Sequence, residues 1–167
     1  MIPYGKQHIT EEDIKSVTKV LKSEYITGGP AVEEFENVVK AYVGVKHAIA
    51  LSNATAGLHV ACLAIGLSKD DVGLTSPITF LASANCIAHC GGIPKFIDID
   101  PKTYCLSPSK LENYLKENQT PKVVIPVDFA GIPSDLPYIH KLSKQYNFKV
   151  IEDAAHSLGS TYIYDGK

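Results

Sequence analysis

The sequence lacks the features that several protein classes require. Its 167 residues carry a formal net charge of −2 and no basic stripe, which argues against a nucleic-acid partner. No apolar run approaches the ~20 residues of a membrane span, so we expect no membrane insertion. The first six residues contain no apolar signal core, so nothing in them directs export. We therefore expect a cytoplasmic protein.

Cysteine is scarce, and its four copies do not have the spacing of a disulfide framework, which fits a reducing compartment. Cys86, His89 and Cys90 could suggest a metal site, but they fall on an apolar helical stretch. No second Cys/His pair completes a tetrahedral ligand set. Small buried thiols are the favoured interpretation, and we predict no metal site.

Two glycine motifs for phosphate groups and one for a catalytic serine are also missing. No Gly-x-Gly-x-x-Gly follows a predicted strand, and no loop ends in Gly-Lys-Ser/Thr, so a nucleotide-binding α/β module is a disfavoured alternative. A hydrolase triad of Ser157, His156 and Asp153 would lack the Gly-x-Ser-x-Gly elbow. It would also crowd all three groups into one short stretch, so we disfavour it.

Two helices are expected in an N-terminal segment, residues 1–45. Thr10 is a plausible N-cap before three acidic residues, and apolar residues follow at helical spacing to Leu21. Gly28-Gly29-Pro30 stops this helix, and a second one is expected over 31–42.

The remainder, residues 46–167, alternates between strand and helix patterns. Strands are predicted at residues 47–52, 72–76, 93–99, 122–127 and in the run that ends at Asp153. Helices are predicted at 54–66, 79–90, 107–118 and 134–146, and Ser107 is the expected N-cap of the third, with Pro108 at its first position. Such alternation indicates an α/β fold with a mostly parallel sheet and helices on its faces. A hairpin is also expected near Asp165-Gly166.

Candidate site residues follow the ends of these strands, where open α/β sheets place ligands. Asp153 ends a buried β-branched run, and capping of the next turn is an equally good interpretation of it. Phe80 follows strand 72–76, although core packing is the more common fate of a Phe. Asp128 follows strand 122–127 and could orient a ligand or cap a turn.

The turn over residues 52–57 joins a strand to a helix through small residues. Free N–H groups at a helix start attract phosphate, and the Thr55 hydroxyl adds a donor. One ligand would use a phosphate at Thr55, a flat ring at Phe80 and a ring nitrogen at Asp153. Pyridoxal phosphate has these parts, and a carboxylate beside its nitrogen keeps the ring protonated and able to accept electrons.

The chain resembles the DegT/DnrJ/EryC1/StrS family of sugar-nucleotide aminotransferases. The resemblance runs from Tyr4 to about Tyr164 and rests on motifs in the family's order, at residues 26–30, 47–56, 76–80, 96–101 and 151–159. It implies a truncated large domain of the aspartate-aminotransferase type (fold type I), with pyridoxal phosphate as cofactor. Within the family, the chain is most similar to enzymes that aminate a UDP-linked 4-keto-6-deoxy sugar for pseudaminic acid.

The resemblance also implies roles for individual residues. Ala54, Thr55 and Ala56 would hold the cofactor phosphate, Phe80 would stack on the ring, Asp153 would pair with the ring nitrogen, and His156 would approach the ring hydroxyl. Tyr4, Glu24, Tyr25, Ile26 and Thr27 would contact the sugar nucleotide. Glutamate is the implied amino donor, and the family's members are homodimers.

Two departures from the family pattern stand out. Gly73 interrupts a strand that is usually more apolar. The Schiff-base lysine of the family falls after residue 167, and Lys167 has no matching context, so we expect these residues alone to be inactive. Two alternatives therefore stay open: a truncated non-catalytic chain or pseudoenzyme, and a sugar-nucleotide dehydratase in which histidine replaces the lysine.

The resemblance further implies the strand order. Strand 93–99 would lie at one edge, followed by 72–76, 122–127, the strand before Asp153, two strands that come after residue 167, and finally 47–52. Strand 47–52 would then lack its neighbours in this chain. We therefore expect that these residues alone do not hold Thr55 and Asp153 at the spacing that the cofactor needs.

Overall fold

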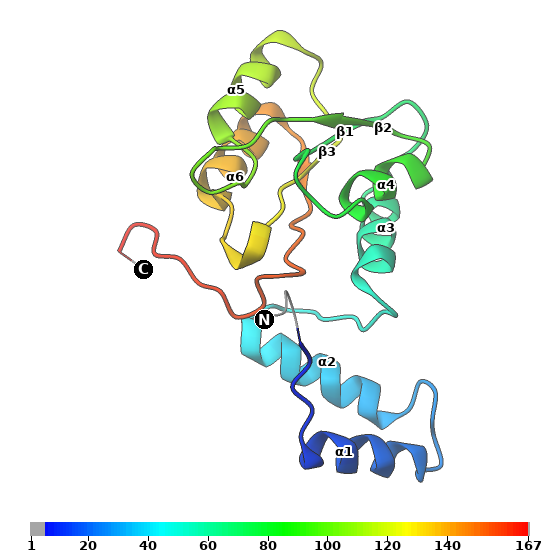
Figure 1. Cartoon of the computed structure of the whole chain (residues 1–167). Coiled ribbons are helices and arrows are strands. Elements are labelled where there is room, and N and C mark those ends of the chain that lie inside the picture. The colour runs from blue at the N-terminus through cyan, green and yellow to red at the C-terminus, as the bar shows by residue number, and fades with distance from the viewer. Residues whose placement is uncertain (1–5, 167) are drawn as a thin grey trace. The chain divides into compact units, whose positions relative to one another are not determined.

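A computed structural model describes residues 6–166, which form two compact units, one up to Ala50 and the other from Leu51 onward (Figure 1). Each unit is described by itself. The prediction for Tyr4 lies outside the described residues. Within residues 6–166, no helix combines the length and the apolar character that a membrane span needs.

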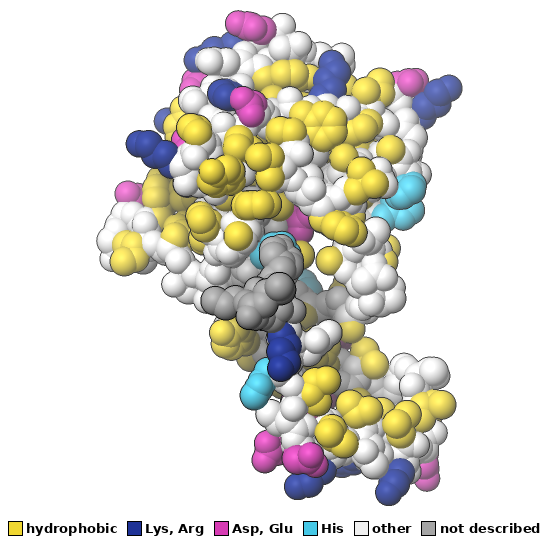
Figure 2. Space-filling view, in the orientation of Figure 1, with side chains coloured by type: hydrophobic (Ala, Val, Ile, Leu, Met, Phe, Trp, Pro, Cys, Tyr) yellow, Lys and Arg dark blue, Asp and Glu magenta, His cyan; other side chains and the backbone are white. Residues whose placement is uncertain are grey.

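The first unit contains two helices, α1 (Glu11–Leu21) and α2 (Pro30–Val43). Thr10 caps α1 as predicted, and the side chain of Asp13 accepts a hydrogen bond from the Thr10 backbone N–H at 2.7 Å. The predicted apolar stripes are present but exposed. Apolar side chains of this unit that face solvent include Ile14, Val17, Leu21, Phe35, Val38 and Tyr42. Figure 2 shows hydrophobic side chains in yellow on the visible surface of this unit.

The predicted strand at residues 47–52 is wrong, because this segment forms no ladder with any described strand. The backbone N–H of Ala50 instead donates to a carboxylate oxygen of Glu36 on α2, at 2.7 Å. An extended segment becomes a strand only when a neighbour pairs with its N–H and C=O groups. None of the four strands among residues 6–166 is such a neighbour to residues 47–52.

The second unit is built on a parallel four-stranded sheet. Its strands are β1 (Val72–Thr75), β2 (Ile93–Phe96), β3 (Val123–Ile125) and β4 (Lys149–Val150). Their order is β2-β1-β3-β4, and all pairs are parallel, so the predicted order of these four is confirmed.

Helices cover both faces of this sheet, as predicted (Figure 1). α3 (Ala54–Ala64) and α4 (Ala82–His89) pack on one face, and α5 (Pro108–Glu117) and α6 (Leu136–Tyr146) pack on the other. A short 3-10 turn, η1 (Phe129–Gly131), follows β3. α5 begins after Ser107, whose hydroxyl accepts the Lys110 N–H, as its sequence signature predicts.

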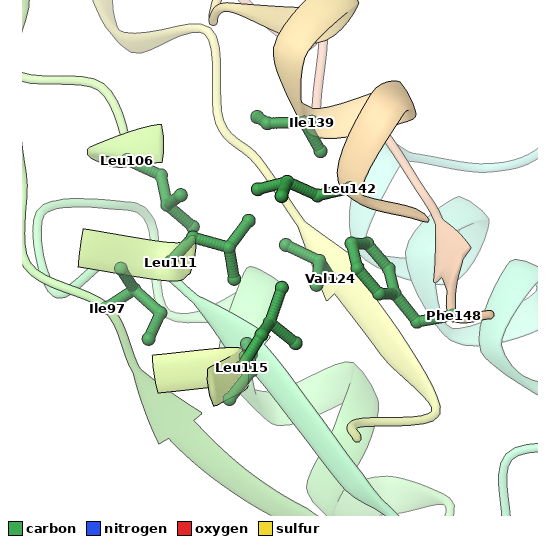
Figure 3. Close-up of a cluster of buried hydrophobic side chains, with 9 residues drawn as sticks. Ile97, Leu106, Leu111, Leu115, Val124, Ile139, Leu142 and Phe148 are labelled. Carbon is green, nitrogen blue, oxygen red and sulfur yellow. The ribbon is translucent and has the colours of Figure 1, made fainter. Parts of the chain in front are cut away.

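The central strand β3 divides the hydrophobic core between the two faces. Val123 and Ile125 point toward α3 and α4, while Val124 points toward α5 and α6. Figure 3 shows the hydrophobic cluster on the α5 and α6 face, in which the labelled residues are Ile97, Leu106, Leu111, Leu115, Val124, Ile139, Leu142 and Phe148. Both faces of β3 are buried, which explains why its sequence is a continuous apolar run.

Three element boundaries differ from the sequence predictions. α4 begins at Ala82 rather than Thr79, because residues 77–79 form a bend after β1. β2 ends at Phe96, and Ile99 instead forms an isolated antiparallel bridge. The expected hairpin near Asp165-Gly166 is a turn without paired strands within the described residues.

Candidate cofactor site at the carboxyl edge of the sheet

The carboxyl ends of β1, β3 and β4 meet at one edge of the sheet because all the strands are parallel. Asp153 extends the ladder just beyond β4. Its N–H donates to the carbonyl of Pro126 at 2.9 Å, and its carbonyl accepts the Asp128 N–H at 3.1 Å. These two bonds fix the backbone of Asp153 against the segment that follows β3.

The side chain of Asp153 is 7% exposed and has two recorded hydrogen-bond donors. The hydroxyl of Ser83, on α4, donates to Oδ2 at 2.6 Å, and the N–H of Ala155 donates to Oδ1 at 3.3 Å. The Ala155 contact is the turn cap considered for this residue, and it is the longer of the two. The shorter bond comes from a different element, so Asp153 is more than a turn cap.

A cavity of about 250 Å³ opens beside this carboxylate. One wall is the first half of α3, and the other is the chain that leaves β4. Its lining residues are Ala54, Gly57, Leu58, Ala61 and the run Ile151–Ala155. The structure therefore brings Ala54 and Asp153, two of the predicted cofactor residues, to the same cavity.

The start of α3 presents donors that suit a phosphate. Asn53 is its N-cap, and the side-chain oxygen of Asn53 accepts the Ala56 N–H at 2.9 Å. The N–H groups of Ala54 and Thr55 come before the first intrahelical bond and remain available. Thr55 is exposed. A phosphate would therefore meet Ala54 and Thr55 first, because the N–H of Ala56 already has a partner.

Phe80 and His156 lie near the same edge on segments that leave β1 and β4. Phe80 is 75% exposed, so the alternative that it packs in the core is wrong. His156 is exposed, and among residues 6–166 no hydrogen bond of its side chain is recorded. Neither residue lines the 250 Å³ cavity, although both have side chains free to contact a ligand.

Asp128 holds the loops around the site rather than a ligand. It is 2% exposed, its Oδ1 accepts the Ser134 N–H at 2.8 Å, and its Oδ2 accepts the Ser157 hydroxyl at 2.7 Å. Ser157 thus donates to Asp128 and not to His156. This geometry contradicts a triad of Ser157, His156 and Asp153.

The carboxyl groups of Glu152 and Asp128 lie close together beside the cavity. Partial burial, a hydrogen bond with Asp128 and the charge of Asp128 raise the pKa of Glu152 to about 7. Glu152 lines the cavity beside Asp153.

The residues predicted to contact the sugar nucleotide belong to the other unit. Glu24, Tyr25, Ile26 and Thr27 form an exposed loop between α1 and α2. The hydroxyl of Ser23 lies 2.9 Å from the Tyr25 carbonyl, which folds this loop back on the end of α1. Their role stays a prediction.

Two of the four cysteines lie in the helical layer that α3 and α4 form on one face of the sheet. Cys62 on α3 and Cys86 on α4 are buried in the same hydrophobic cluster. Among residues 6–166, no group of three or more His, Cys, Asp or Glu side chains is arranged to hold a metal ion.

Sequence reasoning missed the contact between Ser83 and Asp153. The two residues lie 70 positions apart, and no motif links them. The one available signal was the place of Ser83 at the start of a helix that follows the ligand-facing end of a strand. That place put the hydroxyl near the edge but could not pair it with Asp153.

The geometry is that of an α/β protein whose ligand site lies at the carboxyl edge of a parallel sheet. Residues 7–167 match the model of the DegT/DnrJ/EryC1/StrS aminotransferase family, and the chain belongs to that family.

Individual relatives agree with this assignment. The chain is 44% identical over 163 residues to the UDP-4-amino-4,6-dideoxy-N-acetyl-beta-L-altrosamine transaminase of Campylobacter jejuni, covering 97% of this chain and 43% of that protein. Its structure is similar to an aminotransferase from Psychrobacter cryohalolentis, with a TM-score of 0.88 and 31% identity over 96% of this chain and 41% of that one.

A third relative carries a cofactor. NtdA from Bacillus subtilis, a structure with bound cofactor PMP (pyridoxamine phosphate), has a TM-score of 0.81 and 32% identity over 90% of this chain and 35% of that one. The chain thus has the fold of fold type I aminotransferases and spans about two fifths of the length of its relatives.

Proposed function

We propose that this chain is the cofactor-binding part of a pyridoxal-phosphate aminotransferase that transfers an amino group from glutamate to a UDP-linked 4-keto-6-deoxy sugar. One observation carries the proposal: a buried carboxylate, Asp153, and the start of a helix, at Ala54, line one cavity at the carboxyl edge. A carboxylate suits a protonated ring nitrogen, and a helix start suits a phosphate.

Different residues of this chain contact different parts of the cofactor. The Asp153 carboxylate accepts a hydrogen bond from the protonated ring nitrogen. The N–H groups of Ala54 and Thr55 bind the phosphate together with the Thr55 hydroxyl. Phe80 covers the ring, and His156 approaches the ring hydroxyl. Ala56 has a lesser part, since its N–H is bonded to Asn53. The bound cofactor supplies an electron-accepting ring for the carbon at which the amino group is exchanged.

The substrate proposal rests on kinship and on an exposed loop. The Campylobacter jejuni relative is named as a transaminase of a UDP-linked amino sugar. Tyr4 and the loop Glu24–Thr27 are our candidates for sugar-nucleotide contacts, and the loop side chains are exposed and available. Tyr25→Ala is expected to raise the KM for the UDP-sugar with little effect on the KM for glutamate.

Residues 1–167 alone are expected not to catalyse transamination. Transamination by this family uses a lysine that holds the cofactor and moves a proton, and no lysine of this chain stands in the family's lysine motif. Incubation of the chain with the UDP-keto sugar, glutamate and pyridoxal phosphate is expected to yield no amino sugar. Product formation above the protein-free rate would contradict this part of the proposal.

We propose further that the whole protein is a cytoplasmic homodimer. The free cysteines fit a reducing compartment, and the exposed apolar side chains on α1 and α2 fit a surface that is covered in the assembly. Light scattering on the protein eluted from a sizing column measures its mass directly.

Pyridoxamine phosphate is the sharpest probe of the cofactor site, because it binds without a lysine bond. We expect saturable but weak binding to the chain, with a dissociation constant roughly in the millimolar range, since β4 is the edge strand of the described sheet. Asp153→Asn should weaken binding about tenfold or more, because a neutral amide does not pair with a protonated ring.

Asp135→Asn is the matched control for this titration. Asp135 caps α6, where Asn serves equally well, and it does not line the cavity. The control should bind like the unmodified chain. Equal affinity for pyridoxamine phosphate in the Asp153→Asn chain would contradict the proposed role of the carboxylate.

A further inference from the structure

A buried hydroxyl from another element contacts the candidate cofactor carboxylate. Ser83 lies in the first turn of α4 and is 0% exposed, while Asp153 is 7% exposed. Their side chains meet at 2.6 Å, the length of a strong bond between a hydroxyl and a carboxylate. Ser83 has no role among the predicted cofactor contacts.

The direction of this bond follows from counting protons. The Ser83 oxygen lies 2.6 Å from Oδ2 of Asp153 and 3.2 Å from the Phe80 carbonyl, and its single proton goes to the nearer, charged acceptor. The Thr79 hydroxyl lies 2.7 Å from the Ser83 oxygen. Because the Ser83 proton is used, Thr79 must donate to Ser83. The two hydroxyls thus form an oriented chain that runs from Thr79 through Ser83 to Asp153.

This chain of hydroxyls leaves the two carboxylate oxygens unequal. Oδ2 receives the short bond from Ser83, while Oδ1 receives only the 3.3 Å contact from the Ala155 N–H. Each carboxylate oxygen can accept about two bonds. Both oxygens can accept one more donor, but Oδ1 is the less satisfied of the two because its existing contact is long, and Asp153 lines the 250 Å³ cavity.

We propose that Ser83 is a positioning residue that fixes the rotation of the Asp153 carboxylate, so that Oδ1 is presented to a protonated ring nitrogen. This assignment rests on the proposed function, because the ring nitrogen belongs to the proposed cofactor. Thr79 supports Ser83 by supplying the second hydroxyl. If the bond between Ser83 and Asp153 only held α4 against the segment after β4, its loss would not change the protonation of the cofactor ring.

The test is a titration of pyridoxamine phosphate against the chain and its variants. Ser83→Ala should weaken binding about tenfold, which is what the loss of one bond to a charged group is worth. Ser83→Thr keeps the hydroxyl and should restore affinity to within about threefold of the unmodified chain. Thr79→Val, which removes the second hydroxyl, should weaken binding by less than Ser83→Ala does.

Ser143→Ala is the matched control. Ser143 lies on α6 and, like Ser83, reaches the carbonyl three residues before it, in this case that of His140 at 3.0 Å. It makes no contact with Asp153, so its loss should leave the affinity unchanged. If the Ser83→Ala chain loses its far-ultraviolet circular dichroism and is therefore unfolded, the titration uses the Ser83→Cys chain instead. The thiol has nearly the same shape but donates weakly, and binding should weaken about threefold or more.

A spectroscopic readout separates positioning from mere folding. The absorbance of bound pyridoxamine phosphate reports whether its ring nitrogen is protonated. In the unmodified chain the ring should remain protonated to a higher pH than in the Ser83→Ala chain, because Oδ1 is held against the nitrogen. A structural tie would change stability and leave this midpoint in place.

The outcomes distinguish the two proposals. Absence of saturable binding to the unmodified chain contradicts the proposed function and this assignment with it. Saturable binding that depends on Asp153 but not on Ser83, with the same protonation midpoint in both chains, overturns the assignment of Ser83 alone. Binding that depends on both residues and is restored by Ser83→Thr supports the assignment.

Discussion

At the scale of single residues, two aspartates with similar burial have different tasks. Asp128 and Asp153 are both less than 10% exposed and follow adjacent strands. Asp128 accepts two short bonds, from Ser134 and Ser157, and its capacity serves the loops. Asp153 accepts one short bond and lines a cavity. The difference in partners, not the residue type, separates a structural carboxylate from a ligand-binding one.

Removal of the Asp128 carboxylate should destabilise the second unit. Asp128→Ala would leave the buried Ser134 N–H without its acceptor and the Ser157 hydroxyl with only a 3.4 Å contact to the Ala154 carbonyl, at a cost of about 2–4 kcal/mol. Asp128→Asn keeps an oxygen for Ser134 and should cost less. Urea denaturation followed by circular dichroism measures both, and equal stability of all three chains would rule out this role.

Glu152 should make stability depend on pH near neutrality. Its pKa is raised to about 7 in the folded chain, from an ordinary value of 4.5. Between these two values the unfolded chain releases the proton first, so stability should fall as pH rises and level off above pH 7.

Glu152→Gln should remove this slope and stabilise the chain at pH 8. The gain should be about 1 kcal/mol, because solvent screens the carboxyl, which is partly exposed. Denaturation at pH 5 and at pH 8 provides the comparison. A slope that persists in the Gln variant would assign it to another group.

At the scale of elements, the glycine in β1 allows close contact between strand and helix. A Cβ atom on Gly73 would lie 2.6 Å from Cδ1 of Ile87 on α4, closer than atoms can pack. The departure from the usual strand pattern at Gly73 therefore has a packing reason.

Gly73→Ala should destabilise the second unit by about 1–3 kcal/mol through overpacking. The double variant Gly73→Ala with Ile87→Val removes the methyl group that provides the Cδ1 contact and should recover part of the loss. Thermal unfolding of the three chains measures the effect. A Gly73→Ala chain that is as stable as the original would show that Ile87 moves aside freely.

The sequence predicted elements well where the information is local. The capping box at Thr10, the cap of α5 at Ser107 and the apolar run of β3 are all signals within a few residues, and each is present in the structure. Residues 47–52 carry an equally good strand pattern but form no strand. Strand formation depends on a partner, and a partner is not a local property.

The same limit applies to the site. Asp153 and Phe80 became candidates because each follows a strand, and parallel strands end at the same edge. Ser83 was missed because its partner lies 70 residues away. The prediction that Ala56 helps to hold the phosphate did not anticipate that its N–H donates to Asn53. Which elements meet could be predicted, whereas individual hydrogen bonds required coordinates.

At the scale of the whole molecule, the second unit gathers its candidate ligand groups although the sheet has only four described strands. Its order β2-β1-β3-β4 leaves β4 at an edge, yet Ala54 on α3 and Asp153 beyond β4 share a cavity. Thr55 does not line the cavity, so we still expect these residues alone to hold Thr55 and Asp153 off the spacing that tight binding needs. One cofactor molecule that contacts both residues is therefore expected to bind weakly.

The most direct measurement is a map of backbone amide resonances of the labelled chain as pyridoxamine phosphate is added. We expect the amide resonances of Thr55, Phe80 and Asp153 to shift together and to saturate at the same ligand concentration, because one molecule contacts all three segments. Shifts confined to one segment, or different saturation concentrations for the three residues, would contradict it.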